Sequence, residues 1–130
     1  MQQTSDGEKN FLNVDLDLTF TVEIEPLVRE LGELVTELNR TESFVSFELA
    51  TGWPGPRSTD EALAGFATLV RGLSPKAREV WDRLARRTMN VGVEGPPDRH
   101  PLRFAVSRVS IALLVELGAD LVFTVYQPEE

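Results

Sequence analysis

Two aspartates placed two residues apart are the first side chains in this sequence that could do chemistry together. Asp15 and Asp17 alternate with apolar residues, and residues i and i+2 of a β-strand share one face, roughly 7 Å apart. That separation suits paired acid and base catalysis, or one divalent cation. A metal site needs further oxygen ligands, however, and the sequence has no calcium loop and no histidine-containing metal motif. We interpret the pair as part of a solvated strand face, with a small metal-dependent enzyme as one alternative.

The other residue types that catalysis commonly uses are scarce. The single histidine, His100, lies in a proline-bounded loop beside Asp98 and Arg99, and a lone histidine needs a nearby nucleophile and an orienting group to act as a base. The absence of cysteine excludes disulfides and thiolate nucleophiles. There is no Gly-x-Ser-x-Gly elbow and no glycine-rich phosphate loop. We therefore predict a protein that is not an enzyme and takes no cofactor and no metal.

Charge is distributed unevenly along the chain. Residues 1–50 carry eleven acidic side chains against three basic ones, whereas residues 51–130 carry ten of each, so the first part accounts for the whole formal net charge of -8. This imbalance predicts one strongly negative surface, which repels nucleic acid and membranes and attracts a basic protein. The residues that we expect to bind this partner are Asp15, Asp17, Glu23, Glu25 and Trp53.

Trp53 differs from the four acidic candidates, because it stands between Gly52 and Pro54 in a predicted loop. An exposed tryptophan is a frequent anchor at the centre of a protein interface. In the competing interpretation, which we favour, the indole folds back over a sheet edge and has a structural role. The sequence leaves both interpretations open.

A basic stretch occupies the middle of the second half. It could contact phosphates, or it could pack against the acidic strand of a second copy. The acidic character of the whole chain argues against nucleic acid, and two of the arginines, placed in a predicted last helical turn, complement the helix dipole. A homo-oligomer, such as a homodimer, is therefore the main alternative to a basic partner. The residues of this stretch are Arg71, Lys76, Arg78, Arg83, Arg86 and Arg87.

The first three predicted elements contain the acidic candidates. Apolar residues occupy every even position from Leu12 to Ile24, which predicts a long strand with an acidic outer face. Asp15 and Asp17 lie on this face, and Glu23 and Glu25 are expected to extend the same row. Pro26 then opens a predicted helix that runs to Asn39. Residues 44–49 form a second, shorter strand.

The remaining helices are predicted from their caps. Serines precede three apolar helical stripes, and glycines follow two of them. These caps are Ser58, Ser74 and Ser107 at the starts and Gly72 and Gly118 at the ends. Strands are predicted at residues 89–93 and 102–106, joined as a hairpin, and at residues 121–126. Because this last strand is apolar at nearly every position, we expect it in the centre of the sheet.

The predicted order is β-α-β-α-α-β-β-α-β. Strand-helix-strand units at both ends favour parallel neighbours with right-handed connections. We therefore predict an α+β fold, with a mixed sheet of about five strands and helices packed on one face. Residues 11–127 form a single domain after a flexible N-terminal tail of residues 1–10. The chain shows no secretory leader pattern and no apolar stretch long enough for a membrane span, so we expect a cytoplasmic protein.

The C-terminal part adds a resemblance. From Phe104 to Tyr126 the sequence resembles the close of small uncharacterised bacterial α+β proteins, in which a strand, a serine-capped helix, Leu-Gly-Ala and a strand ending in tyrosine recur. The resemblance covers at most the last third of the chain. It implies a small domain of a kind sometimes placed next to toxins as an immunity protein, and it brings no catalytic residues. Our leading hypothesis is an immunity-type inhibitor that covers a basic partner, such as a nuclease toxin, with its acidic strand face.

Overall fold

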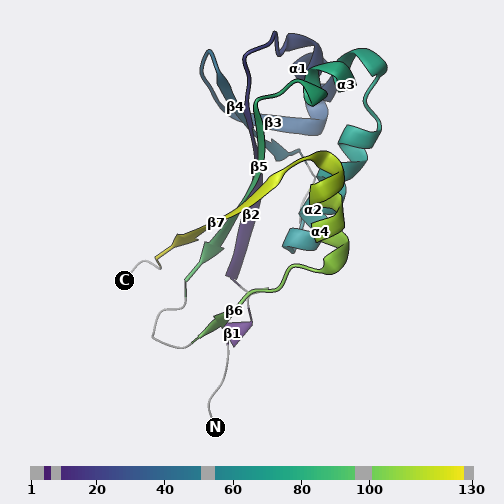
Figure 1. Ribbon diagram of the computed structural model, residues 1–130. Helices are drawn as coiled ribbons and strands as arrows, with labels where there is room; N and C mark the ends of the chain where they lie inside the picture. Colours follow the sequence, from purple (N-terminus) through teal and green to yellow (C-terminus); the bar gives the residue numbers. More distant parts are fainter. Residues whose placement is uncertain (1–4, 7–9, 51–54, 96–100, 128–130) are drawn as a thin grey trace.

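The computed structural model has an α+β fold in which helices pack on one side of a mixed five-stranded sheet (Figure 1). This is the fold class that the sequence predicted. The structure describes residues 5–6, 10–50, 55–95 and 101–127. The strands of the sheet, in spatial order, are β3 (Val35–Arg40), β4 (Phe44–Leu49), β2 (Phe11–Thr19), β5 (Arg86–Glu94) and β7 (Asp120–Tyr126). The helices are α1 (Glu25–Leu31), α2 (Thr59–Arg71), α3 (Pro75–Asp82) and α4 (Arg108–Leu117).

The strand β2 lies at the centre of the sheet and separates the core from the open face. It pairs antiparallel with β4 on one side and with β5 on the other. Its even-numbered residues Val14, Leu16 and Leu18 are buried against the helices. The odd-numbered residues, including Asp15 and Asp17, therefore point to the sheet face that the helices leave uncovered.

The three serine caps are confirmed. The side chain of Ser58 accepts a hydrogen bond from the main-chain N–H of Glu61 at the start of α2. Ser74 and Ser107 cap α3 and α4 in the same way, by accepting from the N–H group three residues later. Each cap satisfies one of the N–H groups that have no partner inside the helix. Gly118, with a φ of 67°, ends α4 in the left-handed conformation that glycine adopts without strain.

The N-terminal elements differ from the prediction. The strand ends at Thr19 rather than continuing to Ile24. The helix predicted to reach Asn39 ends at Leu31, because Gly32 takes a φ of 47°. A short 3-10 turn, Gly32–Leu34, leads from there into β3, which forms a hairpin with β4. The expectation that the two strands of the N-terminal strand-helix-strand unit run parallel was therefore wrong, since β2 and β4 are antiparallel.

The second half of the chain holds two further corrections. Arg86 and Arg87, predicted in a helix, begin β5. The predicted hairpin of residues 89–93 with 102–106 was wrong: β6 (Leu102–Arg103) is short and pairs in parallel with β1 (Ser5–Asp6), so two residues of the expected tail form a strand.

The last strand, β7, contains the predicted residues but has a different position in the sheet. β7 runs parallel to β5, as the connection through α4 suggested, but it lies at the edge of the sheet and not in its centre. Its apolar sequence is explained in part by the segment that precedes α4, because the ring of Phe123 packs against that of Phe104 with centroids 5.4 Å apart. Several of its side chains nevertheless remain exposed.

Candidate functional site

The open face of the sheet brings three carboxylates close together. Asp15 lies opposite Asn90 of β5, and Asp17 lies opposite Ser46 of β4. Glu48 lies two residues beyond Ser46 on the same face of β4. We call Asp15, Asp17 and Glu48 the acidic face. In the part of the chain that the structure describes, no lysine or arginine forms an ion pair with any of them.

Asp15 is the electrostatic centre of this face. Partial burial and, to a smaller extent, the charges of Asp17 and Glu48 together raise the pKa of its carboxyl to about 6. One hydrogen bond opposes this effect, since the amide nitrogen of Asn13 donates to Asp15 Oδ1 at 3.1 Å. Near neutral pH the face therefore carries charges that repel one another and that an approaching cation would relieve.

The neighbouring side chains hold the two aspartates in place. The hydroxyl of Ser46 donates to Asp17 Oδ1 at 2.7 Å. Gly92 makes room for Asn13, because a Cβ atom at position 92 would lie 2.4 Å from Asn13 Oδ1. These contacts fix the carboxylates on β2, so the acidic face is a preorganised surface rather than a set of independent side chains.

Glu23 and Glu25 do not extend the acidic face. Both come after the end of β2, and Glu25, the first residue of α1, forms an ion pair with Arg40. Glu23 lies beside a depression of about 240 Å³ that Lys76 and Arg83 also line. The prediction of a continuous acidic row was wrong because the alternation of apolar residues persists through a bend in which Phe20 and Ile24 still reach the core.

Two other candidates lie outside the described residues. Trp53 falls within residues 51–54, and His100 falls within residues 96–100. The expectations for a tryptophan anchor and for the lone histidine therefore stay predictions.

The basic stretch is distributed over three elements, and most of its charges have partners. Arg71 pairs with Glu116, Arg78 with Asp82, Arg83 with Glu79 and Arg86 with Asp120.

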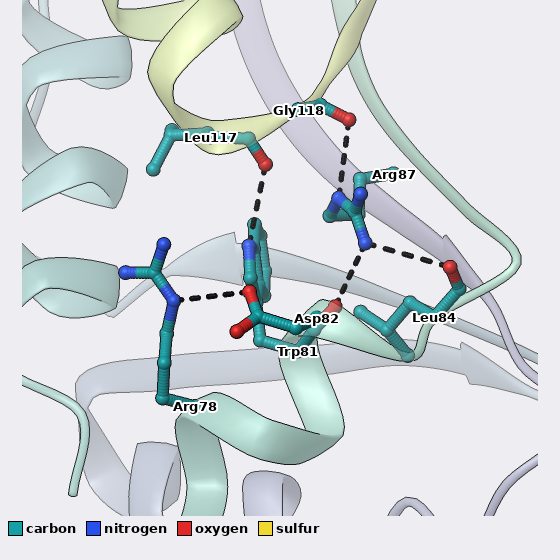
Figure 2. A network of polar contacts seen from close by, with 7 residues as sticks. All are labelled: Arg78, Trp81, Asp82, Leu84, Arg87, Leu117 and Gly118. Carbon is teal, nitrogen blue, oxygen red and sulfur yellow. Dashed lines mark hydrogen bonds and ion pairs between the residues drawn. The ribbon is translucent and has the colours of Figure 1, made fainter. Parts of the chain in front are cut away.

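Arg87 has a structural role within the network shown in Figure 2. Its guanidinium donates to the carbonyl oxygens of Trp81 and Leu84 at the end of α3 and of Gly118 at the end of α4. The indole N–H of Trp81 donates to Leu117 O at 3.2 Å. Arg87 thus places a positive charge at the C-terminal ends of α3 and α4, as predicted for a helix end, but it does so from β5 and not from the last turn of a helix.

The sequence interpretation missed Glu48 and Ser46. Their signal was present, because both alternate with the buried residues Val45 and Phe47 in the short predicted strand. The alternation shows that they share a face. Which strand lies next to them depends on tertiary pairing, which the alternation does not contain.

Two further observations concern possible ligands and membranes. Among the ranges that the structure covers, no three histidine, aspartate or glutamate side chains form a group that could hold a metal ion. In the same ranges, no helix has the length and apolar character needed to cross a membrane.

Comparisons with known proteins found no relative of this chain. No protein-family model, no curated protein and no solved structure matches the chain. The resemblance of the C-terminal part to immunity-type domains stays a prediction, and the candidate site rests on its own geometry.

Proposed function

We propose that this protein is a non-enzymatic binding domain that receives a basic partner protein on its acidic face. The observation that carries the proposal is the position of Asp15 and Asp17: both lie on the side of the central strand that the helices leave uncovered. Their charges are not neutralised by any ion pair within the described ranges. Burial is the main cause of the raised pKa of Asp15, and a cationic side chain placed between the two aspartates would offset the repulsion from Asp17 that adds to it.

The partner class that best fits such a surface is a protein with a positively charged active-site region. A nuclease toxin has this property, since its site must attract phosphates. An immunity-type inhibitor would cover that region and compete with the nucleic acid for the same cations. Charge complementarity of this kind accelerates the encounter of the two proteins and excludes partners of the wrong sign.

The test uses two double variants with the same change of net charge. D15N/D17N removes both aspartate charges from the acidic face, and E33Q/E42Q removes two charges from exposed positions outside the sheet face. A partner captured by the wild-type protein from a lysate of the source organism is purified, and its association rate is measured at low ionic strength. We expect D15N/D17N to slow association by about tenfold or more, and E33Q/E42Q to leave it nearly unchanged.

The outcome distinguishes a local interface from a general charge effect. Equal slowing by both double variants would show that only the net charge matters. An association rate that neither variant changes would remove the acidic face from the interface. Inhibition of the captured protein's nuclease activity by the wild-type chain would support the immunity-type assignment, and a captured partner with no such activity would contradict it.

A further inference from the structure

Exposed apolar side chains gather on α4 and β7. Of the ten large hydrophobic residues found exposed, seven belong to these two elements. Val115 is the most exposed of them, at 77%. Exposed apolar surface of this kind marks interaction sites on soluble proteins. Val122 and Tyr126 lie on the open face of the sheet, as does Thr124, whose hydroxyl donates to Asn90, whereas Phe123 and Val125 lie on the helix side. The seven residues are Val109, Ile111, Val115, Val122, Phe123, Val125 and Tyr126.

The free edge of β7 presents main-chain groups that could pair with another strand. The carbonyl of Tyr126 accepts from Gly95 N at 2.8 Å, so it points toward β5. Because successive residues of a strand direct their main-chain groups to opposite sides, those of Leu121, Phe123 and Val125 point to the free edge.

The opposite edge of the sheet has features that block such pairing, and β7 lacks them. β3 carries Glu37 and Arg40, and its register with β4 shifts between Glu37 and Asn39. Charges and bulges are devices that protect natural edge strands. β7 has no charged residue after Asp120, contains no proline and pairs with β5 in an unbroken register.

The apolar flank of α4 points the same way as this edge. α2 packs over β2 and β4, and α4 lies beside it (Figure 1). The α2 side of α4 is fixed by Asp60, which accepts from Ser110 Oγ. Ile111 and Val115, one turn apart, lie on the flank turned away from α2. Because α2 covers β2 and β4, α4 lies on the β7 side of α2, and we call this flank together with the free edge of β7 the border.

We propose that a second copy of this chain binds this border, so that β7 pairs antiparallel with β7 of the second copy and the two α4 helices meet across the seam. A two-fold axis through such a seam makes the same patch serve both copies. It also places the helices of both copies on the same side of a continuous sheet.

Charge favours a second copy over a basic partner at this border. The acidic side chains of α4 and β7, Glu116 and Asp120, already form ion pairs, Glu116 with Arg71 and Asp120 with Arg86. The strand order separates β7 from the acid-rich first part of the chain, which supplies β2, β3 and β4. Two copies that meet at β7 therefore keep their negative surfaces apart, whereas a basic partner would be attracted to the acidic face.

The pattern of free main-chain groups selects a register. Pairing centred on Phe123 aligns Phe123 with its own symmetry copy and Leu121 with Val125. All three outward-pointing residues then lie in hydrogen-bonded pairs, whereas a shift in either direction leaves one of them beyond the pairing.

The first experiment measures mass by sedimentation and light scattering at tens of micromolar. We expect twice the chain mass of 14.5 kDa. Val125→Pro removes an N–H that points to the free edge and leaves the pairing with β5 intact, and Val115→Lys places a charge on the α4 flank. Each should raise the dimer dissociation constant about tenfold or more. Leu34→Lys, at an exposed apolar position outside the border, is the matched control and should leave the dimer unchanged.

The second experiment reads the register, because the chain has no native cysteine. Phe123→Cys should form an intermolecular disulfide on mild oxidation, since paired Cα atoms lie about 5.5 Å apart. Val122→Cys and Thr124→Cys report the two shifted registers and should cross-link more slowly. A monomeric wild-type protein would overturn the proposal, as would a dimer that both Val125→Pro and Val115→Lys leave intact. Dominant cross-linking at position 122 or 124 would overturn the register. D15N/D17N should not change the mass, so this test is independent of the proposed function.

Discussion

Replacing Asp15 by asparagine should make the protein more stable at alkaline pH and leave its stability nearly unchanged at acidic pH. The pKa of Asp15 is raised from 3.8 to about 6, chiefly by burial and then by Asp17 and Glu48. Because the folded protein binds this proton more tightly than the unfolded chain does, protonation favours folding. The ionised carboxylate therefore destabilises the folded state above about pH 6, and this penalty disappears as the pH falls below about 4.

The size of the effect follows from the shift in pKa. A change from 3.8 to about 6 corresponds to about 3 kcal/mol at full strength. Asp15 is only half-buried, and solvent screening reduces the value for such a group, so we expect a gain of about 1 kcal/mol for D15N at pH 8. For a chain of 130 residues this equals an increase in Tm of about 4 °C. The amide is close in shape to the carboxyl and can still accept the hydrogen bond from Asn13.

Urea unfolding of both proteins between pH 4 and pH 8 measures this difference directly. Comparing wild type with D15N at each pH cancels the titration of groups that the two proteins share. Glu42→Gln, at an exposed position, is the control and should show a difference near zero throughout. The conclusion that the ionised Asp15 carboxylate destabilises the folded protein would be refuted by either of two results. One is a difference in unfolding free energy between D15N and wild type that does not vary with pH, and the other is a D15N protein less stable than wild type at pH 8.

Three further outcomes follow from the contacts described. Arg87→Met should cost about 2 kcal/mol in urea unfolding, because it removes a charged donor from carbonyls at two helix ends; Arg86→Met, which breaks only an exposed ion pair, should cost far less. Gly92→Ala should displace Asn13 and raise the pKa of Asp15 measured by NMR titration, and an unchanged pKa would show that the Asn13 contact is unimportant. Binding of a basic partner should weaken below pH 6 as Asp15 is protonated, and D15N should abolish this step in the pH profile.

The local signals in the sequence were sufficient for the caps and for the inner strands. Ser58, Ser74 and Ser107 bond to N–H groups only three residues away, so nothing distant can change their role. The alternation in β2 is equally local, and it correctly places Asp15 and Asp17 on one face. The fold class follows from these elements, because their faces must be buried against one another.

The segment after Gly32 could not be predicted in this way. Leu31, Leu34, Val35 and Leu38 have helical spacing, but Leu34 and Leu38 are exposed in the folded protein. The hairpin with β4 decides the conformation of this segment, and hairpin pairing is a tertiary contact that overrides weak helical preferences. The ion pair between Arg40 and Glu25 depends on the same pairing, which is why the sequence did not show that Glu25 is neutralised.

The misplacement of β7 has a different cause, and it bears on the proposed dimer. A strand that is apolar at nearly every position is typical of the interior of a sheet, yet β7 lies at an edge with Phe123 and Val125 half exposed. The apolar pattern of β7 therefore disagrees with its position at the edge of the sheet. Pairing with β7 of a second copy would give this strand neighbours on both sides and bring its sequence and its surroundings into agreement. The acidic face lies toward the other end of each sheet and would remain open in both copies, so such a dimer could bind two basic partners at once.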